Sequence, residues 1–170
     1  GLWDGYTLYD LYKEASLPWE WHKPLFELAA EIDITIFSSP FDKTAIDFLE
    51  DLNCPAYKIA SFEAIDLELI RYAAATKKPL IISTGMADQE EISEAIEAAR
   101  EGGANEIAIL HCVSSYPAPA KDYNLNTLKD MMPRFKLVAG LSDHTIENYT
   151  AFGAIAIGAT IIEKHFTLSR

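Results

Sequence analysis

Short apolar runs alternate with amphipathic segments along most of this sequence, and that alternation restricts the fold more than any other feature. Six runs have the length and composition of buried strands, at residues 34–38, 56–60, 79–83, 106–112, 136–141 and 159–163. The segments that flank them repeat apolar residues at helical spacing, over 20–32, 43–52, 67–76, 89–101, 125–132 and 146–157. Repeated strand–helix units predict an α/β protein with a parallel sheet.

Two architectures surround a parallel sheet with helices, the (β/α)8 TIM barrel and the doubly wound open sheet. The strand candidates recur every 20 to 30 residues, roughly the repeat of a barrel. No glycine-rich dinucleotide or phosphate-binding loop follows any of them. Polar stretches such as SSPFD (38–42), STGM (83–86) and SDHT (142–145) follow the strands instead. A TIM barrel builds its active site from those strand ends, so we expect an incomplete barrel with about six βα units.

The helix expected at 89–101 carries the clearest boundary signals. Asp88 precedes it and can cap its first turn, where Glu90 and Glu91 suit the positive end of the helix dipole. The stretch EGGANE (101–106) then predicts a helix stop followed by a turn into the next strand.

Composition excludes several classes of partner. The 170 residues allow one sizeable core and not two ordinary domains. The net charge is −12, from 14 basic and 26 acidic side chains, which disfavours nucleic acid and anionic membranes as partners. No stretch has the length of a transmembrane helix. Cys54 and Cys112 form no metal or redox spacing and favour a reducing cytoplasm.

Two consecutive strand candidates each end in an acid and a histidine. His144 follows Asp143, and His165 comes 21 residues later, two positions after Glu163. Because neighbouring barrel strands lie roughly 5 Å apart, both imidazoles can reach one divalent ion such as manganese, zinc or iron. Each histidine can also be a structural residue, and the two acids can be ligands, supporting partners or solvated side chains.

Lys58 interrupts the apolar strand in PAYKIAS (55–61). A lysine inside a barrel strand is costly unless it meets an anion, although its stem can also be buried while the amine reaches water. Hydroxyl side chains at the strand ends can add hydrogen bonds to a phosphate without adding charge. Those are Ser38, Ser39, Ser61, Ser83, Thr84, Ser114, Ser115 and Ser142, with Tyr116 as a residue that either hydrogen-bonds or only packs. By strand alternation, Lys164 faces the helices if His165 faces the barrel interior.

At these strand ends the sequence resembles the N-acetylneuraminate (sialic acid) synthase family. The ordered motifs are FSSPFD, AYKIASFE, PLIISTGM, LHCVSSYPAP, GLSDHT and EKHFTLSR, and they cover nearly the whole chain. The stretch LYDLYKEASLPWEWHKPLF (8–26) is most similar to the pseudaminic acid synthase branch.

The resemblance implies a reaction and a cofactor. These enzymes condense phosphoenolpyruvate with an N-acylated amino sugar, here the diacetamido-trideoxy precursor of pseudaminic acid, and release phosphate. They use a divalent metal, commonly Mn²⁺, with Mg²⁺ or Co²⁺ as alternatives. Matched by motif, the metal ligands are His144 and His165, and Lys58 holds phosphoenolpyruvate, which makes these three the catalytic residues. The hydroxyls near that ligand fall on Ser39, Ser61, Ser83, Ser114 and Ser142, with Tyr116 beside them; the sialic acid branch often has asparagine at position 114.

The resemblance also implies a larger protein than this chain. Residues 1–170 are expected to be a partial TIM-barrel synthase domain without its first two strands and its C-terminal antifreeze-like domain. The full-length protein is expected to be a cytoplasmic homodimer, and the 170 residues alone to have little or no activity. Three alternatives stay open. The protein can be a sialic or legionaminic acid synthase, a metal-free Schiff-base aldolase that uses Lys58, or a non-catalytic barrel that binds a sugar or phosphate.

Overall fold

The computed structural model describes residues 5–168, which divide into two compact units at Ile36 and Phe37. The first unit contains two helices, α1 (Leu8–Ala15) and α2 (Trp19–Glu31). α2 lies within one residue of the helix predicted at 20–32, whereas α1 was not predicted. Its start has a recognisable signal, because the Thr7 hydroxyl accepts a hydrogen bond from the backbone N–H of Asp10 at 3.1 Å.

The second unit contains a five-stranded parallel sheet. Its strands are β1 (Tyr57–Ile59), β2 (Leu80–Ser83), β3 (Ile107–Cys112), β4 (Val138–Asp143) and β5 (Ile161–Lys164). They are ordered β1-β2-β3-β4-β5, each paired with its neighbour in sequence. A doubly wound sheet reverses its strand order at a switch point. The sequential order therefore excludes that architecture and agrees with the predicted incomplete TIM barrel.

The predicted strand at 34–38 forms only one bridge, between Ser38 and Tyr57. The other residues of that run are not in a strand. Within the described residues this segment has a sheet neighbour only on the β1 side, so its backbone groups lack the second ladder that holds an interior parallel strand. The remaining five strand predictions are confirmed to within about two residues at each end.

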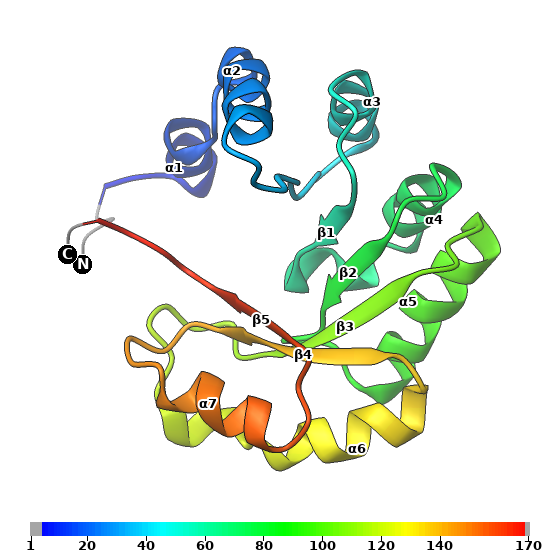
Figure 1. The fold of residues 1–170 in the computed structure, drawn as a ribbon, viewed down its shortest axis with the longest axis vertical. Coiled ribbons are helices and arrows are strands. Elements are labelled where there is room, and N and C mark those ends of the chain that lie inside the picture. The colour runs from blue at the N-terminus through cyan, green and yellow to red at the C-terminus, as the bar shows by residue number, and fades with distance from the viewer. Residues whose placement is uncertain (1–4, 169–170) are drawn as a thin grey trace. The chain divides into compact units, whose positions relative to one another are not determined.

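Five helices lie on the outer face of the curved sheet (Figure 1). They are α3 (Lys43–Asp51), α4 (Leu67–Ala75), α5 (Gln89–Gly102), α6 (Asn126–Phe135) and α7 (Tyr149–Ala156). Short 3₁₀ helices follow β1 and β3, namely η1 (Ser61–Ile65) and η2 (Ala120–Tyr123). α6 runs through Pro133 and ends three residues beyond the predicted boundary at 132.

The boundaries of α5 are those that the sequence predicts. Asp88 accepts hydrogen bonds from the N–H groups of Glu90 and Glu91, and the Glu91 carboxylate accepts one from the Asp88 N–H, which completes a capping box. Gly103 ends the helix at φ 106°, a left-handed conformation that glycine adopts without steric cost.

An ion pair between the first and last strands shows that the sheet is strongly curved. In a flat sheet, four strand spacings of about 4.8 Å would separate β1 from β5 by roughly 19 Å. Lys58 Nζ of β1 nevertheless lies 3.7 Å from Glu163 Oε2 of β5. Their extended side chains cannot bridge the flat distance, so the sheet is curved enough for side chains of its first and last strands to meet on the concave side.

The apolar core lies between the sheet and its helices. One cluster joins α5, β3, α6 and β4 through Ile92, Ile96, Ile109, Met131 and Ala139. Another joins the same face of β4 to η2, α6 and α7 through Tyr123, Leu128, Leu141 and Ala154. Since strand residues alternate between faces, the polar residues next to these positions point to the concave side.

Candidate functional site

The candidate site lies at the carboxyl ends of β1 to β5, on the concave face of the sheet. The register pairs Ser142 with Glu163 and Asp143 with Lys164. Ser142 and Glu163 face the concave side, where Glu163 meets Lys58. Asp143 and Lys164 therefore point the other way, toward the helices, as the alternation of strand residues requires.

Lys58, Glu163 and Ser142 form a polar chain across the barrel. The Ser142 hydroxyl donates to Glu163 Oε1 at 2.6 Å, and the Lys58 ammonium donates to the carbonyl oxygen of Ile59 at 2.9 Å besides pairing with Glu163. Lys58 is only 6% exposed. Burial lowers the pKa of Lys58, and the nearby Glu163 carboxylate partly opposes that shift. A buried ammonium whose one charged partner lies as far away as 3.7 Å can also bind an anion.

The two predicted metal histidines lie next to each other. The ring centroids of His144 and His165 are 5.3 Å apart with an interplanar angle of 81°. Tyr116 packs against both, at 4.1 Å from His144 and 5.6 Å from His165 between ring centroids. His144 Nδ1 donates to the carbonyl oxygen of Val113 at 2.8 Å, and the neutral ring then presents its Nε2 lone pair to a ligand.

This pair fits a divalent ion. With metal–nitrogen bonds of about 2.1 Å, two imidazoles that share one ion have ring centroids roughly 5 Å apart, close to the 5.3 Å observed. Within residues 5–168 no cluster of three or more histidine, cysteine, aspartate or glutamate side chains adds a further ligand. A metal here would therefore take two nitrogen ligands from the described residues and leave coordination positions open to water or substrate oxygens.

Two of the predicted hydroxyl groups are buried without a partner. The hydroxyl oxygens of Ser83 and Ser114 have no hydrogen-bond partner within the described part of the chain. Such groups are rare in folded proteins, and a bound ligand is one way to satisfy them. The Ser61 hydroxyl lies near by, because it accepts a hydrogen bond from the Gly85 N–H at 3.2 Å. Ser39 lies at the sheet edge, one residue past the bridge at Ser38.

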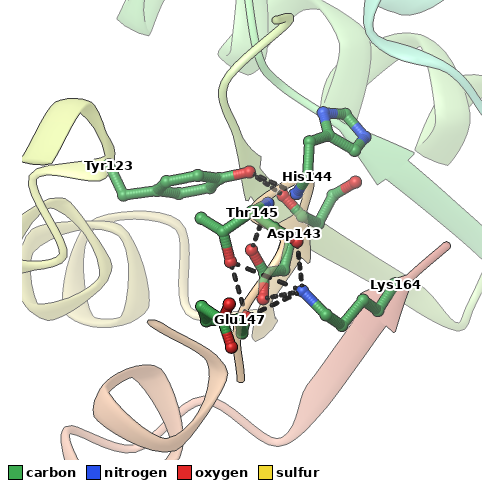
Figure 2. A network of polar contacts seen from close by, with 7 residues as sticks. Tyr123, Asp143, His144, Thr145, Glu147 and Lys164 are labelled. Carbon is green, nitrogen blue, oxygen red and sulfur yellow. Dashed lines mark hydrogen bonds and ion pairs between the residues drawn. The ribbon is translucent and has the colours of Figure 1, made fainter. Parts of the chain in front are cut away.

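The acids that precede the histidines have different roles. Asp143 is fully buried and accepts a hydrogen bond from the Lys164 ammonium at 2.8 Å, so it is not a solvated side chain (Figure 2). Glu163 is held by Ser142 and Lys58. Lys164 lies on the helix side of β5, as expected.

Sequence reasoning missed two residues that lie near this site. Glu63 of η1 is half-buried, and its Oε2 has no hydrogen-bond partner within residues 5–168. Burial raises the pKa of Glu63, which makes it a candidate proton donor or acceptor near Lys58. Tyr123 of η2 is fully buried and hydrogen-bonds to the backbone of β4 and His144. Burial raises the pKa of Tyr123 to about 12. The SFE sequence after β1 is a signal for Glu63, whereas no sequence signal separates Tyr123 from an ordinary core tyrosine.

A cleft of about 660 Å³ opens beside the histidines. Its walls are the loop after β3, the loop between β4 and α7, and the segment that follows β5. Tyr116, His144, Glu147, Lys164 and His165 line it. A space of this size accommodates a sugar-sized ligand next to the two imidazoles.

Fold and site together define an incomplete TIM barrel with a polar site at the carboxyl ends of its strands, where TIM-barrel enzymes have their active sites. The profile of the NeuB family matches residues 1–170. The chain belongs to the NeuB family, as its motifs predict.

Named relatives refine this assignment. A pseudaminic acid synthase of Helicobacter pylori is 49% identical over 169 residues, covering 99% of this chain and 50% of that protein. An N,N'-diacetyllegionaminic acid synthase of Campylobacter jejuni is 40% identical over 151 residues, covering 88% and 45%. The crystal structure of a sialic acid synthetase from Leptospira borgpetersenii superposes with a TM-score of 0.89 at 31% identity, covering 94% and 56%. The chain thus spans about half the length of the curated relatives that it matches.

Among residues 5–168, no helix combines the length and apolar character that crossing a membrane requires.

Proposed function

We propose that the protein containing this chain is a pseudaminic acid synthase. It condenses phosphoenolpyruvate with a diacetamido-trideoxy amino sugar and releases phosphate. The observation that carries the proposal is a set of side chains at the strand ends of a chain that is 49% identical to a pseudaminic acid synthase. The set consists of one buried lysine, a histidine pair and two serine hydroxyls that have no hydrogen-bond partner within residues 5–168. A synthase for sialic or legionaminic acid is the alternative within the same reaction class.

Phosphoenolpyruvate suits the anion-binding half of this site. The Lys58 ammonium supplies a charge that burial leaves poorly solvated, so a phosphate or carboxylate oxygen would stabilise it. Ser83 and Ser114 would donate hydrogen bonds that they do not make within residues 5–168. Ser142 already donates its proton to Glu163, so it can only accept from a ligand while that bond persists. Ser39 and Ser61 complete the proposed ring of hydroxyls.

The part of the site that contains the histidine pair suits binding of the sugar substrate. His144 and His165 would hold a divalent ion, Mn²⁺ in this proposal, and Tyr116 supports both rings from one side. The chemistry that a bound ion supplies is Lewis-acid polarisation of the aldehyde of the open-chain sugar. The vinyl carbon of phosphoenolpyruvate forms the new bond to that aldehyde carbon, water adds to the carbon bearing the phosphate, and phosphate leaves. Fixed charges and dipoles aimed at these centres would supply most of the rate enhancement.

Phosphate release by the full-length protein tests this proposal. The assay supplies phosphoenolpyruvate, Mn²⁺ and a panel of N-acetylmannosamine and the precursors of legionaminic and pseudaminic acids, with a blank lacking sugar. We expect release only with the pseudaminic acid precursor, and its loss in EDTA. Release with another sugar would move the assignment to that branch. Absence of release with every sugar would leave a non-catalytic binding barrel as the better reading.

A matched pair of lysine variants separates site chemistry from stability. Lys58→Met removes an ammonium that is paired with Glu163 at the carboxyl end of the sheet. Lys78→Met removes one that is paired with Glu50 just before β2, at the opposite end. We expect Lys58→Met to abolish phosphate release and Lys78→Met to keep it while lowering the melting temperature. Equal activity of the two variants would contradict the role proposed for Lys58.

One observation favours a second function, that of a Schiff-base aldolase. Burial and a lowered pKa are what a nucleophilic lysine needs, and Lys58 has both. Borohydride reduction in the presence of pyruvate would trap an adduct on Lys58 in that case. We expect no adduct, because the histidine pair has no task in a metal-free aldolase.

Assembly and compartment belong to the same proposal. The two cysteines are both free and buried, which suits a reducing cytoplasm. The homodimer stays a prediction for the full-length protein.

A further inference from the structure

The residues directly before the two histidines form an ion pair with each other. Asp143 precedes His144, Lys164 precedes His165, and the two are partners in the register of β4 and β5. Lys164 Nζ lies 2.8 Å from Asp143 Oδ2, and the Asp143 side chain is fully buried. The pair is therefore a direct link between the two chain segments that carry the imidazoles.

The same lysine also binds the loop that leaves β4. Its ammonium donates to the carbonyl oxygens of Thr145 at 2.6 Å and Glu147 at 3.0 Å. The second carboxylate oxygen of Asp143 accepts from the Thr145 N–H at 2.9 Å. Residues 143–147 thus wrap around one ammonium group, with His144 in the wrapped segment (Figure 2). Its three protons all have acceptors, so the side chain has a single favourable position.

Tyr123 holds His144 from the opposite side. Its hydroxyl oxygen accepts a hydrogen bond from the His144 N–H at 2.6 Å and donates its proton to the Ser142 carbonyl oxygen at 3.1 Å. The tyrosine ring is fully buried in the core between η2, α6 and α7. The backbone of His144 is therefore held by a rigid group, while the Val113 carbonyl oxygen orients its ring.

We propose that Tyr123, Asp143 and Lys164 are positioning residues that set the separation of the His144 and His165 imidazoles and thereby the affinity of the pair for a divalent ion. This inference rests on the metal site of the proposed function. We call the three residues the histidine clamp. Removing a group that hydrogen-bonds to a metal ligand and orients it typically lowers metal affinity by about 10- to 100-fold. We expect an effect of roughly that size here.

A purely structural role is the competing explanation. In that case the clamp would only stabilise the rim of the barrel, and its loss would lower the melting temperature without changing how a bound metal is coordinated. The distinction requires a variant that keeps the core filled. Tyr123→Phe removes only the hydroxyl that contacts His144 and Ser142. Tyr57→Phe is the matched control, because Tyr57 is also fully buried and loses a hydrogen bond, to Glu50, away from the histidines.

Mn²⁺ binding to the full-length variants tests the clamp without requiring activity. Electron paramagnetic resonance reports free Mn²⁺ and, through the zero-field splitting, the geometry of bound Mn²⁺. We expect Tyr123→Phe to raise the Mn²⁺ dissociation constant about tenfold and to change the zero-field splitting. Tyr57→Phe should leave both unchanged while lowering the melting temperature by a similar amount. Unchanged Mn²⁺ affinity and splitting in a folded Tyr123→Phe protein would overturn the inference.

Lys164 variants keep the proposal testable if Tyr123→Phe does not fold. Lys164→Met should weaken Mn²⁺ binding, and Lys164→Arg, which retains the charge, should restore most of it. Wild-type affinity in folded Lys164→Met protein would refute the clamp. A protein with both His144→Ala and His165→Ala is the control for the metal site. It distinguishes an error in the clamp proposal from an error in the proposed metal site. If wild type and this double variant bind Mn²⁺ equally, the metal site itself is wrong and the clamp falls with it.

Discussion

Gly85, two residues past β2, determines where two of the proposed ligand-binding hydroxyls can lie. A Cβ atom added to Gly85 would stand 2.6 Å from the Ser114 hydroxyl oxygen and 2.8 Å from that of Ser61. Ordinary contacts begin at about 3.4 Å, so Gly85→Ala displaces Ser114 Oγ by about 0.8 Å and Ser61 Oγ by about 0.6 Å. Both atoms end short side chains that can rotate, and only the Cys112 Cβ at 3.2 Å needs a shift of the core.

We therefore expect Gly85→Ala to weaken phosphoenolpyruvate binding much more than it lowers the stability of the fold. A hydrogen bond from a hydroxyl to a charged group contributes about 1.5–3 kcal/mol, and a displacement of this size removes most of it. Loss of one such bond raises KM for phosphoenolpyruvate by about 10- to 100-fold, since 1.4 kcal/mol corresponds to a factor of ten. Rotation of the two hydroxyls also weakens the hydrogen bond that Ser61 accepts from the Gly85 N–H, and the net loss of one such bond costs the fold about 1 kcal/mol.

Two measurements on the full-length protein test this prediction. Steady-state phosphate release at varied phosphoenolpyruvate concentration gives KM, and a thermal melt gives the stability. Gly153→Ala is the control, because its Cβ would meet only the flexible Leu125 Cδ1, at 2.9 Å. We expect a raised KM for Gly85→Ala alone, with both melting temperatures within a few degrees of wild type. An unchanged KM in Gly85→Ala would refute the proposed role of the Ser61 and Ser114 hydroxyls. A large loss of stability would refute the packing argument instead.

Three further predictions concern the fold. Gly140→Ala would place a Cβ 2.3 Å from the Ile161 carbonyl oxygen, forcing β4 and β5 apart; urea unfolding should show a loss of about 1–3 kcal/mol. Burial lowers the pKa of His111 below its ordinary 6.5, so the unfolded chain binds more protons as pH falls below that value. Stability should therefore fall from pH 7 to 5 in urea titrations, and less steeply in His111→Gln. Asp88→Ala removes two N-cap hydrogen bonds of α5, and calorimetry should show a loss of about 1 kcal/mol.

Strands β1 to β5 and the helices other than α1 were predictable from sequence because their signals are local. Apolar runs, the Asp88 cap and the Gly103 stop each act within a few residues, and the structure confirms them. The barrel was predicted from the absence of a glycine-rich loop and from the polar residues at the strand ends, and the sequential strand order agrees with it. The run at 34–38 was misread, because its apolar composition says nothing about whether a second strand lies beside it.

The histidine pair was predictable because one structural rule brings it together. Parallel neighbours in register place their carboxyl ends side by side, so acid–histidine sequences one repeat apart converge. The pairing of Lys58 with Glu163 did not follow from any such rule. It depends on how far the sheet curls between β1 and β5, which no local pattern encodes. Tyr123 was missed for a related reason, because its partner residues are 19 and 21 positions away.

The pleat of β4 and β5 explains why a charged residue directly precedes each histidine. Asp143 and Lys164 point to the helix side, where Asp143 is fully buried and Lys164 is partly buried, so the two charges pair more strongly than they would in water. Their histidine neighbours then reach the cleft at the strand ends. A pair of apolar residues at 143 and 164 would fill the same space but could not bind the loop 143–147, whose carbonyl oxygens need a donor. Fixing that loop with an ion pair whose carboxylate is buried is therefore costly in desolvation but holds the histidines in place before a metal binds.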